Sequence, residues 1–323
     1  MPSRRYEALL LLHLTVFIWG WTGILGKLID QSSLQLVLMR SIIALAGLGA
    51  WAVYARRTLF AEPREILQYL LTSVLITGHW LTFYGAIKIS TASIAVACLS
   101  TSTVFTALME PFWYKRRIRT YEVVLGLVVI AALLLIFGLE TKHRLGIVVA
   151  TVSALLSAWF NVVNGVLVKR GDALRIGFYE LLGVMLALYA CIGLAAWLPA
   201  DLLHSTPALT FLAGESLPPV LWSLPADQVV YHLLLGLVCT SFAFVAGIAV
   251  MRQLSPFTVM LTVNLEPVYT IVIALLIWGS EERLTTGSYI GFALILACLF
   301  LNGWWQRRKT ALETTEPDPL AQG

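Results

Sequence analysis

The chain of 323 residues is 59% hydrophobic and only 12% charged, with a formal net charge of +4. Soluble domains are roughly 45 to 50% apolar and about 25% charged, so this composition excludes an ordinary soluble protein and indicates one that lies in a lipid bilayer. The small positive excess is typical of the loops of membrane proteins. It gives no reason to expect a nucleic-acid partner.

Ten apolar stretches, separated by short polar breaks, are each long enough to cross a bilayer, which takes roughly 20 helical residues. The first one follows Arg4 and Arg5, but it is too long for a signal peptide and no cleavage motif follows it, so we expect it to be retained. The fold class predicted is all-α, a polytopic membrane protein of ten transmembrane helices. The predicted spans are 7–29, 34–55, 66–87, 91–114, 121–139, 145–168, 175–198, 229–251, 256–278 and 285–305.

Lys and Arg are distributed unevenly between the two sides of this topology. With the amino terminus inside, the inner segments hold sixteen of them and the outer segments five, while Arg40 lies within a span. Short loops rich in Lys and Arg stay in the cytoplasm, so both termini are predicted to be cytoplasmic.

Two internal alignments indicate a repeat. An offset of 140 residues pairs Trp19 with Trp159 and Arg40 with Glu180. An offset of 165 pairs Ser90 with Ser255, Trp113 with Trp278, Thr120 with Thr285, Gly126 with Gly291 and Gly138 with Gly303. One insertion, the Pro-rich loop near 199–228, accounts for the difference between the offsets.

The predicted domains are a first repeat at 1–140, a second at 141–306 with the extracytoplasmic insertion at 199–228, and a disordered cytoplasmic tail at 307–323. Five helices per repeat is an odd number, so the second repeat enters the membrane from the opposite side. Inverted repeats of this kind are typical of secondary transporters, in which two equivalent arrangements of the halves open one central site to either side.

Two stretches resemble the EamA-type family of the drug/metabolite transporter superfamily. Leu265–Ala297, which begins L-E-P-V-Y-T-I-V and continues through W-G-S-E-E-R-L-T-T-G, is similar to the end of the family repeat, and F-I-W-G-W-T-G-I-L-G-K at 17–27 is similar to its start. The resemblance implies a ten-helix inner-membrane carrier of metabolites such as amino acids or drugs. It also implies a central cavity lined by helices 1, 3, 4, 6, 8 and 9. The first repeat departs from the pattern, because Thr101-Ser102 stands where the second has Glu266-Pro267.

Glu266 is the leading candidate for a substrate-binding residue. It lies about ten residues into the span that begins near Pro256, close to the middle of the bilayer, where a charged side chain should face protein or water. Pro267 removes a helix donor beside it, and Asn264 and Tyr269 add polar groups. The alternative is a structural carboxyl group that packs helices together.

Three other charged residues lie within spans. Arg40 and Glu180 occupy matching places in helices 2 and 7, toward the periphery of the expected cavity, where they serve in helix packing or in gating contacts. Glu110 is close to the inner end of helix 4, where an ion pair with Lys115 is expected.

Aromatic and amide side chains concentrate in the middle of several spans, away from the interface where Trp usually collects. Core filling explains any one of them, but together they favour a pocket for an amphipathic solute. The candidate substrate-binding residues are Glu266, Asn264, Tyr269, His79, Trp80, Tyr84, Trp19, Trp159, Asn161 and Ser102.

No metal site and no cofactor are predicted. The cysteines fall in four separate spans without C-x-x-C spacing, and the histidines lack ligand spacing on a helix. The four cysteines, Cys98, Cys191, Cys239 and Cys298, are interpreted as small core side chains, and no disulfide framework is implied.

The function that these patterns favour is a secondary transporter that exports a small amino acid-like or amphipathic metabolite by alternating access. Its partners are the substrate, the bilayer and, as a candidate coupling ion, the proton, and the protein is a monomer or a homodimer. Two alternatives stay open. One is a polytopic membrane enzyme that uses His79, Glu266 and Arg40, and the other is a sensor that transports nothing.

Overall fold

The structure, a computed structural model, describes residues 2–115, 117–137, 143–199 and 217–279, together with part of the stretch 287–305. Every regular element in this part of the chain is helical. The predicted tail 307–323 and most of the predicted insertion 199–228 lie outside the described residues. The elements are α1 Pro2–Leu28, α2 Ser33–Tyr54, α3 Pro63–Ile89, α4 Ala92–Leu99, α5 Ser102–Tyr114, α6 Thr120–Phe137, α7 Arg144–Leu167, α8 Ala173–Trp197, η3 Leu221–Ser223, α10 Ala226–Leu233, η4 Leu234–Phe242, α11 Ala243–Val250, α12 Pro256–Val263 and α13 Glu266–Trp278.

Seven helical stretches of the described chain are long and apolar enough to cross a membrane, which supports the predicted polytopic, all-helical class. They comprise α1, α2, α3, α7, α8, the continuous run from α10 to α11, and the run from α12 to α13. The predicted fourth span is divided into α4 and α5, and the fifth corresponds to α6. The tenth, 285–305, is helical at the positions described. The count of ten helices and the inverted repeats stay predictions.

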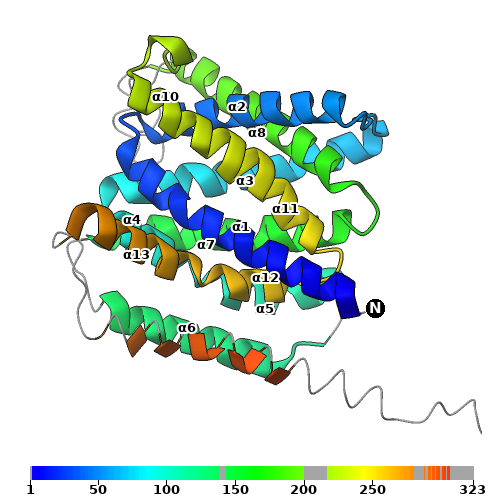
Figure 1. Ribbon diagram of the computed structural model, residues 1–323, viewed down its shortest axis with the longest axis vertical. Helices are drawn as coiled ribbons and strands as arrows, with labels where there is room; N and C mark the ends of the chain where they lie inside the picture. Colours follow the sequence, from blue (N-terminus) through cyan, green and yellow to red (C-terminus); the bar gives the residue numbers. More distant parts are fainter. Residues whose placement is uncertain are drawn as a thin grey trace, which may run out of the picture.

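Helices from the two halves of the chain interleave. α3 packs along α7 and α8, α2 along α8 and η4, and α5 along α7 and α12. In Figure 1, α2 and α8 lie at one end of the molecule and α6 at the other, with α1, α4, α7 and α13 between them. The core is therefore shared between the halves, and any central site receives side chains from both.

Three helix starts follow ordinary capping chemistry. The side chains of Ser32, Asp172 and Ser255 accept hydrogen bonds from backbone N–H groups in the first turns of α2, α8 and α12. These caps satisfy donors that have no partner inside a helix. Pro256, as the first residue of α12, adds a fixed φ angle where its missing N–H costs nothing.

Two of the predicted spans are interrupted near their middle. The predicted span 256–278 corresponds to a helical stretch Pro256–Trp278 that is interrupted where Pro267 was expected to disturb it, since α12 ends at Val263 and α13 begins at Glu266. Pro267 has no N–H to donate to the carbonyl four residues back. In the turn before it, the N–H groups of Asn264 and Leu265 instead donate to the carbonyl groups three residues earlier. α4 and α5 are separated in the same way around Ser100 and Thr101, one residue from the position that the 165-residue offset assigns.

The span that contains η4 is widened by π-helical hydrogen bonding. The hydroxyl groups of Thr240 and Ser241 each donate to a carbonyl five residues earlier, at 2.6 and 3.2 Å. π turns inside α-helices occur frequently at functional sites, because the extra residue displaces a side chain from the regular pattern.

Close approach of α1 to α13 and α11 depends on the absence of side chains. A Cβ atom on Gly20 would lie 2.7 Å from Cβ of Tyr269, and one on Gly247 would lie 2.7 Å from the ring of Trp19. Small residues let transmembrane helices pack at short range. Here they bring the Trp19 side chain and the start of α13 to the same region.

Candidate functional site

A cavity lies where the interrupted helices meet α1, α3, α7 and α11. Its volume, counted as space open to the centres of water molecules, is about 80 Å³, which is room for several waters. All six helices that were expected to line the cavity contribute to its wall, and α2 contributes as well. The lining residues are Trp19, Thr22, Arg40, His79, Trp80, Phe83, Leu99, Ser102, Ser157, Phe160, Asn161, Cys239, Phe244, Gly247, Ile248, Met260, Val263 and Glu266.

Glu266 is the acidic group on this wall. As the first residue of α13, its carboxyl group is beside the N-terminus of a helix, where the partial positive charge of the peptide dipoles favours an anion. One oxygen lies 3.4 Å from the hydroxyl of Thr22, which makes a shorter 2.7 Å bond to the carbonyl of Trp19. The carboxyl group therefore keeps most of its hydrogen-bonding capacity for whatever enters the cavity.

Arg40 is the basic group, and its position corrects the expectation of a peripheral charge. Its side chain is 3% exposed and lines the cavity. Nε and Nη2 donate to the hydroxyl of Thr240 at 3.0 and 2.8 Å, and Nη1 donates to the hydroxyl of Tyr84 at 2.6 Å. The π turn displaces Thr240 toward α2, and this contact cannot be derived from sequence spacing.

His79 is held by the backbone of α7. Its Nδ1 lies 3.0 Å from the carbonyl oxygen of Ser153 and 2.8 Å from the hydroxyl of the same residue. The hydroxyl also lies 2.9 Å from the carbonyl of His79, to which it donates. Because a carbonyl only accepts, Nδ1 carries the proton in the neutral ring, and Nε2 is left as an acceptor.

The remaining lining candidates add aromatic faces and an amide. Trp80 packs edge to face with Phe244, with ring centroids 5.8 Å apart. Asn161 donates from Nδ2 to the carbonyl of Ser157 at 2.9 Å, which leaves its side-chain oxygen as an acceptor. Together with Trp19 and Ser102, these residues form a mainly apolar wall that has a few directed polar groups, as small-molecule sites commonly do.

Four sequence candidates lie away from the cavity wall. Tyr84 is wholly buried and supports Arg40, Asn264 donates to the hydroxyl of Thr103 at 3.0 Å, and Tyr269 packs edge to face on Phe17. Trp159 is 40% exposed on the outside of α7. Successive residues of a helix point about 100° apart, so the neighbouring Phe160 faces the cavity in its place.

Residues that the sequence reasoning missed include Ser157 and Phe160, which with Asn161 follow the three- and four-residue spacing of one helix face. That spacing was a usable signal. Thr22, Met260 and Phe244 carry no comparable sign in the sequence, since apolar and small residues surround them on all faces of their helices.

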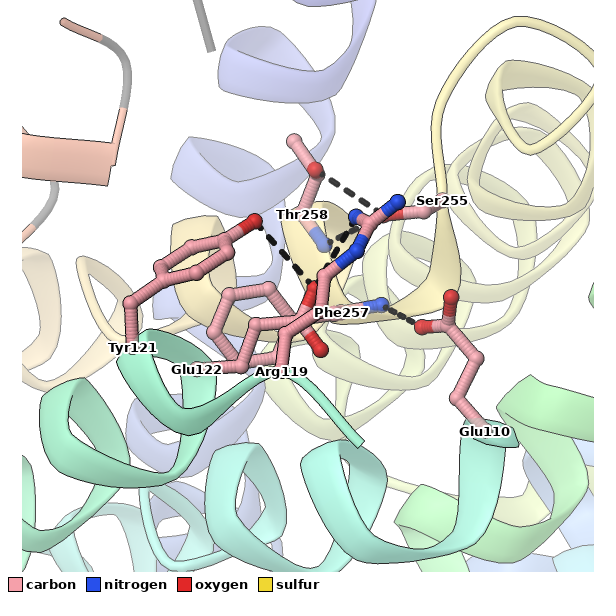
Figure 2. Close-up of polar contacts among 7 residues, drawn as sticks. All are labelled: Glu110, Arg119, Tyr121, Glu122, Ser255, Phe257 and Thr258. Carbon is pink, nitrogen blue, oxygen red and sulfur yellow. Dashed lines mark hydrogen bonds and ion pairs between the residues drawn. The ribbon is translucent and has the colours of Figure 1, made fainter. Parts of the chain in front are cut away.

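Glu180 and Glu110 lie outside the cavity. Glu180 is wholly buried and accepts a hydrogen bond from Asn164 Nδ2 at 3.1 Å. Glu110, for which an ion pair with Lys115 was expected, accepts a 2.8 Å hydrogen bond from the backbone N–H of Phe257 and is 3% exposed. Figure 2 shows this carboxyl group at the start of α12, near the contacts of Glu122 with Arg119 and Tyr121.

Comparisons with known proteins agree with this architecture. Residues 7–138 match the family described as the EamA-like transporter family. The curated proteins that were searched contain no match. Among the solved structures, one crystal structure of a protein shares 14% identity, covers 91% of this chain and 96% of its own, and superposes with a TM-score of 0.69. At that identity the likeness shows the fold alone.

Proposed function

Because residues 7–138 match the model of the EamA-like transporter family, we propose that this chain is a member of that family, within the drug/metabolite transporter superfamily, and a secondary transporter that exports a small metabolite by alternating access. The members of that family are membrane transporters and not enzymes. The proposed substrate is amino acid-like or otherwise amphipathic. The proposed setting is a bacterial inner membrane, with both termini in the cytoplasm.

One observation carries the proposal: the cavity lies at the two helix interruptions, and both a carboxyl group and a guanidinium group line it. Interrupted transmembrane helices at the centre of a carrier present helix ends and unpaired backbone groups to a solute. Charged residues so deep in a membrane protein are expensive to keep, which favours a functional role for Glu266 and Arg40 over a purely structural one.

Each polar group on the wall has a defined part in this proposal. Glu266 binds an amino group of the solute or carries a proton. Arg40, which has N–H groups beyond the three already bonded, attracts an anionic group. His79 accepts a hydrogen bond through Nε2, while Trp19 and Trp80 cover apolar parts of the solute.

The conformational cycle follows from the proposed repeats at 1–140 and 141–306. If the two halves are related by inversion, exchanging their arrangements closes the cavity on one side and opens it on the other. The space of about 80 Å³ is small for a metabolite, so loading requires the halves to separate. A monomer contains every group that this cycle needs, and a homodimer is compatible with it.

Transport in sealed proteoliposomes tests the function. A mixture of metabolites is loaded inside, and the solutes that leave are identified. Glu266→Gln should lower the rate of efflux at least about tenfold, equivalent to roughly 1.4 kcal/mol of lost interaction, with thermal stability close to that of the wild type. Glu7→Gln, at an exposed residue of α1, is the control. Efflux by the Glu266→Gln variant at the wild-type rate over a range of pH would exclude Glu266 from the mechanism.

A further inference from the structure

Glu180 on α8 is a fully buried carboxyl group that the cavity does not use. Its side chain is 0% exposed, and one oxygen, Oε1, has no hydrogen-bond partner in the described part of the chain. The other oxygen accepts from Asn164 Nδ2 at 3.1 Å. A buried anion without a counter-ion is strongly disfavoured, so this arrangement requires an explanation.

Asn164 supplies that explanation. Its side-chain oxygen, Oδ1, is also buried and also lacks a partner. The two side chains are thus joined by one hydrogen bond, and each holds one unused acceptor. Two acceptors cannot bond to each other, but a proton on the carboxyl group turns one of them into a donor.

We propose that Glu180 and Asn164 form a proton-binding site whose loading and unloading couples solute movement to a proton gradient. In the protonated state, Oε1–H of the neutral acid donates to Asn164 Oδ1, while Asn164 Nδ2 donates to Glu180 Oε2. Binding adds one proton from water to the carboxylate and release returns it to water, so no other reactant takes part. The coupling rests on the proposed transport function, whereas the proton site itself does not.

In the described part of the chain, the cations on α8 and on the helices packed against it are at helix ends or engaged elsewhere, and Arg175 on α8 itself pairs with Glu65 at 3.7 Å. α8 packs against α2, α3 and α11, and it meets α7 through Asn164. α11 has no titratable residue, and the only one on α7 is Arg144, at its start. On α2, Tyr54 is the last residue, and the guanidinium of Arg40 is engaged by Thr240 and Tyr84.

On α3, Tyr69 is within the electrostatic reach of Glu180, and more strongly of Glu65 and Arg175. The other titratable residues on α3 are at its ends or engaged elsewhere: His79 contacts α7, Tyr84 contacts Arg40, and Lys88 donates to the carbonyl of Ile29. Arg64 and Glu65 are in the first turn.

The proposed route of the proton passes Tyr69. Its hydroxyl lies against Gly171 in the loop before α8, and it interacts electrostatically with Glu65, Arg175 and Asp172 as well as with Glu180. At this end of the molecule Asp172 pairs with Arg57 at 2.7 Å, and Glu65 pairs with Arg175 at 3.7 Å. Tyr69 is therefore within the electrostatic reach of both the charged residues at this end of the molecule and the buried carboxyl group.

Infrared difference spectroscopy tests the proton site without any transport assay. The infrared spectrum of the wild type, after subtraction of the spectrum of Glu180→Gln, should contain the C=O stretching band of a protonated carboxyl group. Exchange into D2O should shift this band. A glutamine at 180 can donate to Asn164 Oδ1 and accept from Nδ2, so the variant keeps the fold by imitating the protonated pair. If the difference spectrum contains no such band in buffers from acid to alkaline, the proton site is excluded.

Proteoliposomes test the coupling. An imposed pH gradient should drive solute accumulation by the wild type and by the control Glu7→Gln, whereas Glu180→Gln should exchange solute for solute but ignore the gradient. Tyr69→Phe should keep the infrared band and slow the response to the gradient. Accumulation by Glu180→Gln equal to that of the wild type overturns the coupling. A wild type that moves no solute overturns the proposed transport function and leaves the infrared result to decide the proton site.

Discussion

The guanidinium carbon of Arg40 lies 4.1 Å from the centre of the Trp80 ring, so a cation and an aromatic face form one continuous part of the cavity wall. The ring limits how the guanidinium can turn, and Thr240 and Tyr84 hold its nitrogens from the other side. Planar stacking combined with directed hydrogen bonds is characteristic of arginine and unsuited to lysine.

Arg40→Lys keeps the charge but loses the planar contacts. We expect it to lower the free energy of unfolding by about 2 kcal/mol, the size of one or two hydrogen bonds to a charged group, and to impair transport. Thermal unfolding in detergent checks the stability. Arg57→Lys, at an exposed pair with Asp172, is the matched control and should change the stability by less than about 1 kcal/mol. Equal stabilities for Arg40→Lys and the wild type would contradict the packing described here.

Gly20→Ala should destabilise the contact between α1 and α13. The added methyl group would lie 2.7 Å from Cβ of Tyr269, too close for two carbon atoms, and we expect a loss of about 1 to 3 kcal/mol. Gly85→Ala is the control, since a Cβ atom there meets nothing within 4 Å. That change should be neutral or stabilise α3 by about 0.5 to 1 kcal/mol. A higher melting temperature for Gly20→Ala than for Gly85→Ala would show that the helices pack differently.

Glu110→Ala should loosen the start of α12. It removes the carboxyl acceptor from the backbone N–H of Phe257, a loss of about 1 kcal/mol that is comparable with removal of a helix cap. Hydrogen exchange at the first amides of α12 measures the effect directly. Ser255→Ala, which removes the cap of the same helix, should raise exchange similarly. Unchanged exchange in Glu110→Ala would mean that this contact does not stabilise the helix.

Trp19→Ala and Trp159→Ala separate the cavity from the outer surface. The two tryptophans correspond under the 140-residue offset, but only Trp19 lines the cavity, while Trp159 is exposed on α7. Trp19→Ala should reduce transport at least about tenfold through lost contact with the solute, roughly 1.4 kcal/mol or more, whereas Trp159→Ala should transport normally. Equal losses in the two variants would argue against the assigned cavity.

The sequence predicted the helices well, because the thickness of the bilayer dictates their length. The second span was expected at 34–55 and is Ser33–Tyr54, and the seventh was expected at 175–198 and is Ala173–Trp197. Residues 7–138, which include the motif around Trp19, match the model of the EamA-like transporter family, while the motif around Glu266 lies outside the matched residues.

Whether an individual side chain points into the cavity or away from it was much harder to predict. In helices that are apolar on all sides, hydrophobic periodicity carries little information, so Trp159 was assigned to the cavity and Arg40 to the periphery. The π turn at Thr240 comes with a contact to Arg40, which is distant in sequence. The interruption before Glu266 was easier to predict, because Pro267 removes a helix donor there.

Accessibility of position 102 tests the central claim most directly. Ser102 lines the cavity at the start of α5, so Ser102→Cys, in a variant whose four native cysteines are replaced, reports which side of the membrane the cavity faces. A membrane-impermeant thiol reagent should label this cysteine when added to either side of sealed vesicles, and transported solute should slow both reactions. Labelling from one side under all conditions, or from neither, would contradict alternating access at this cavity.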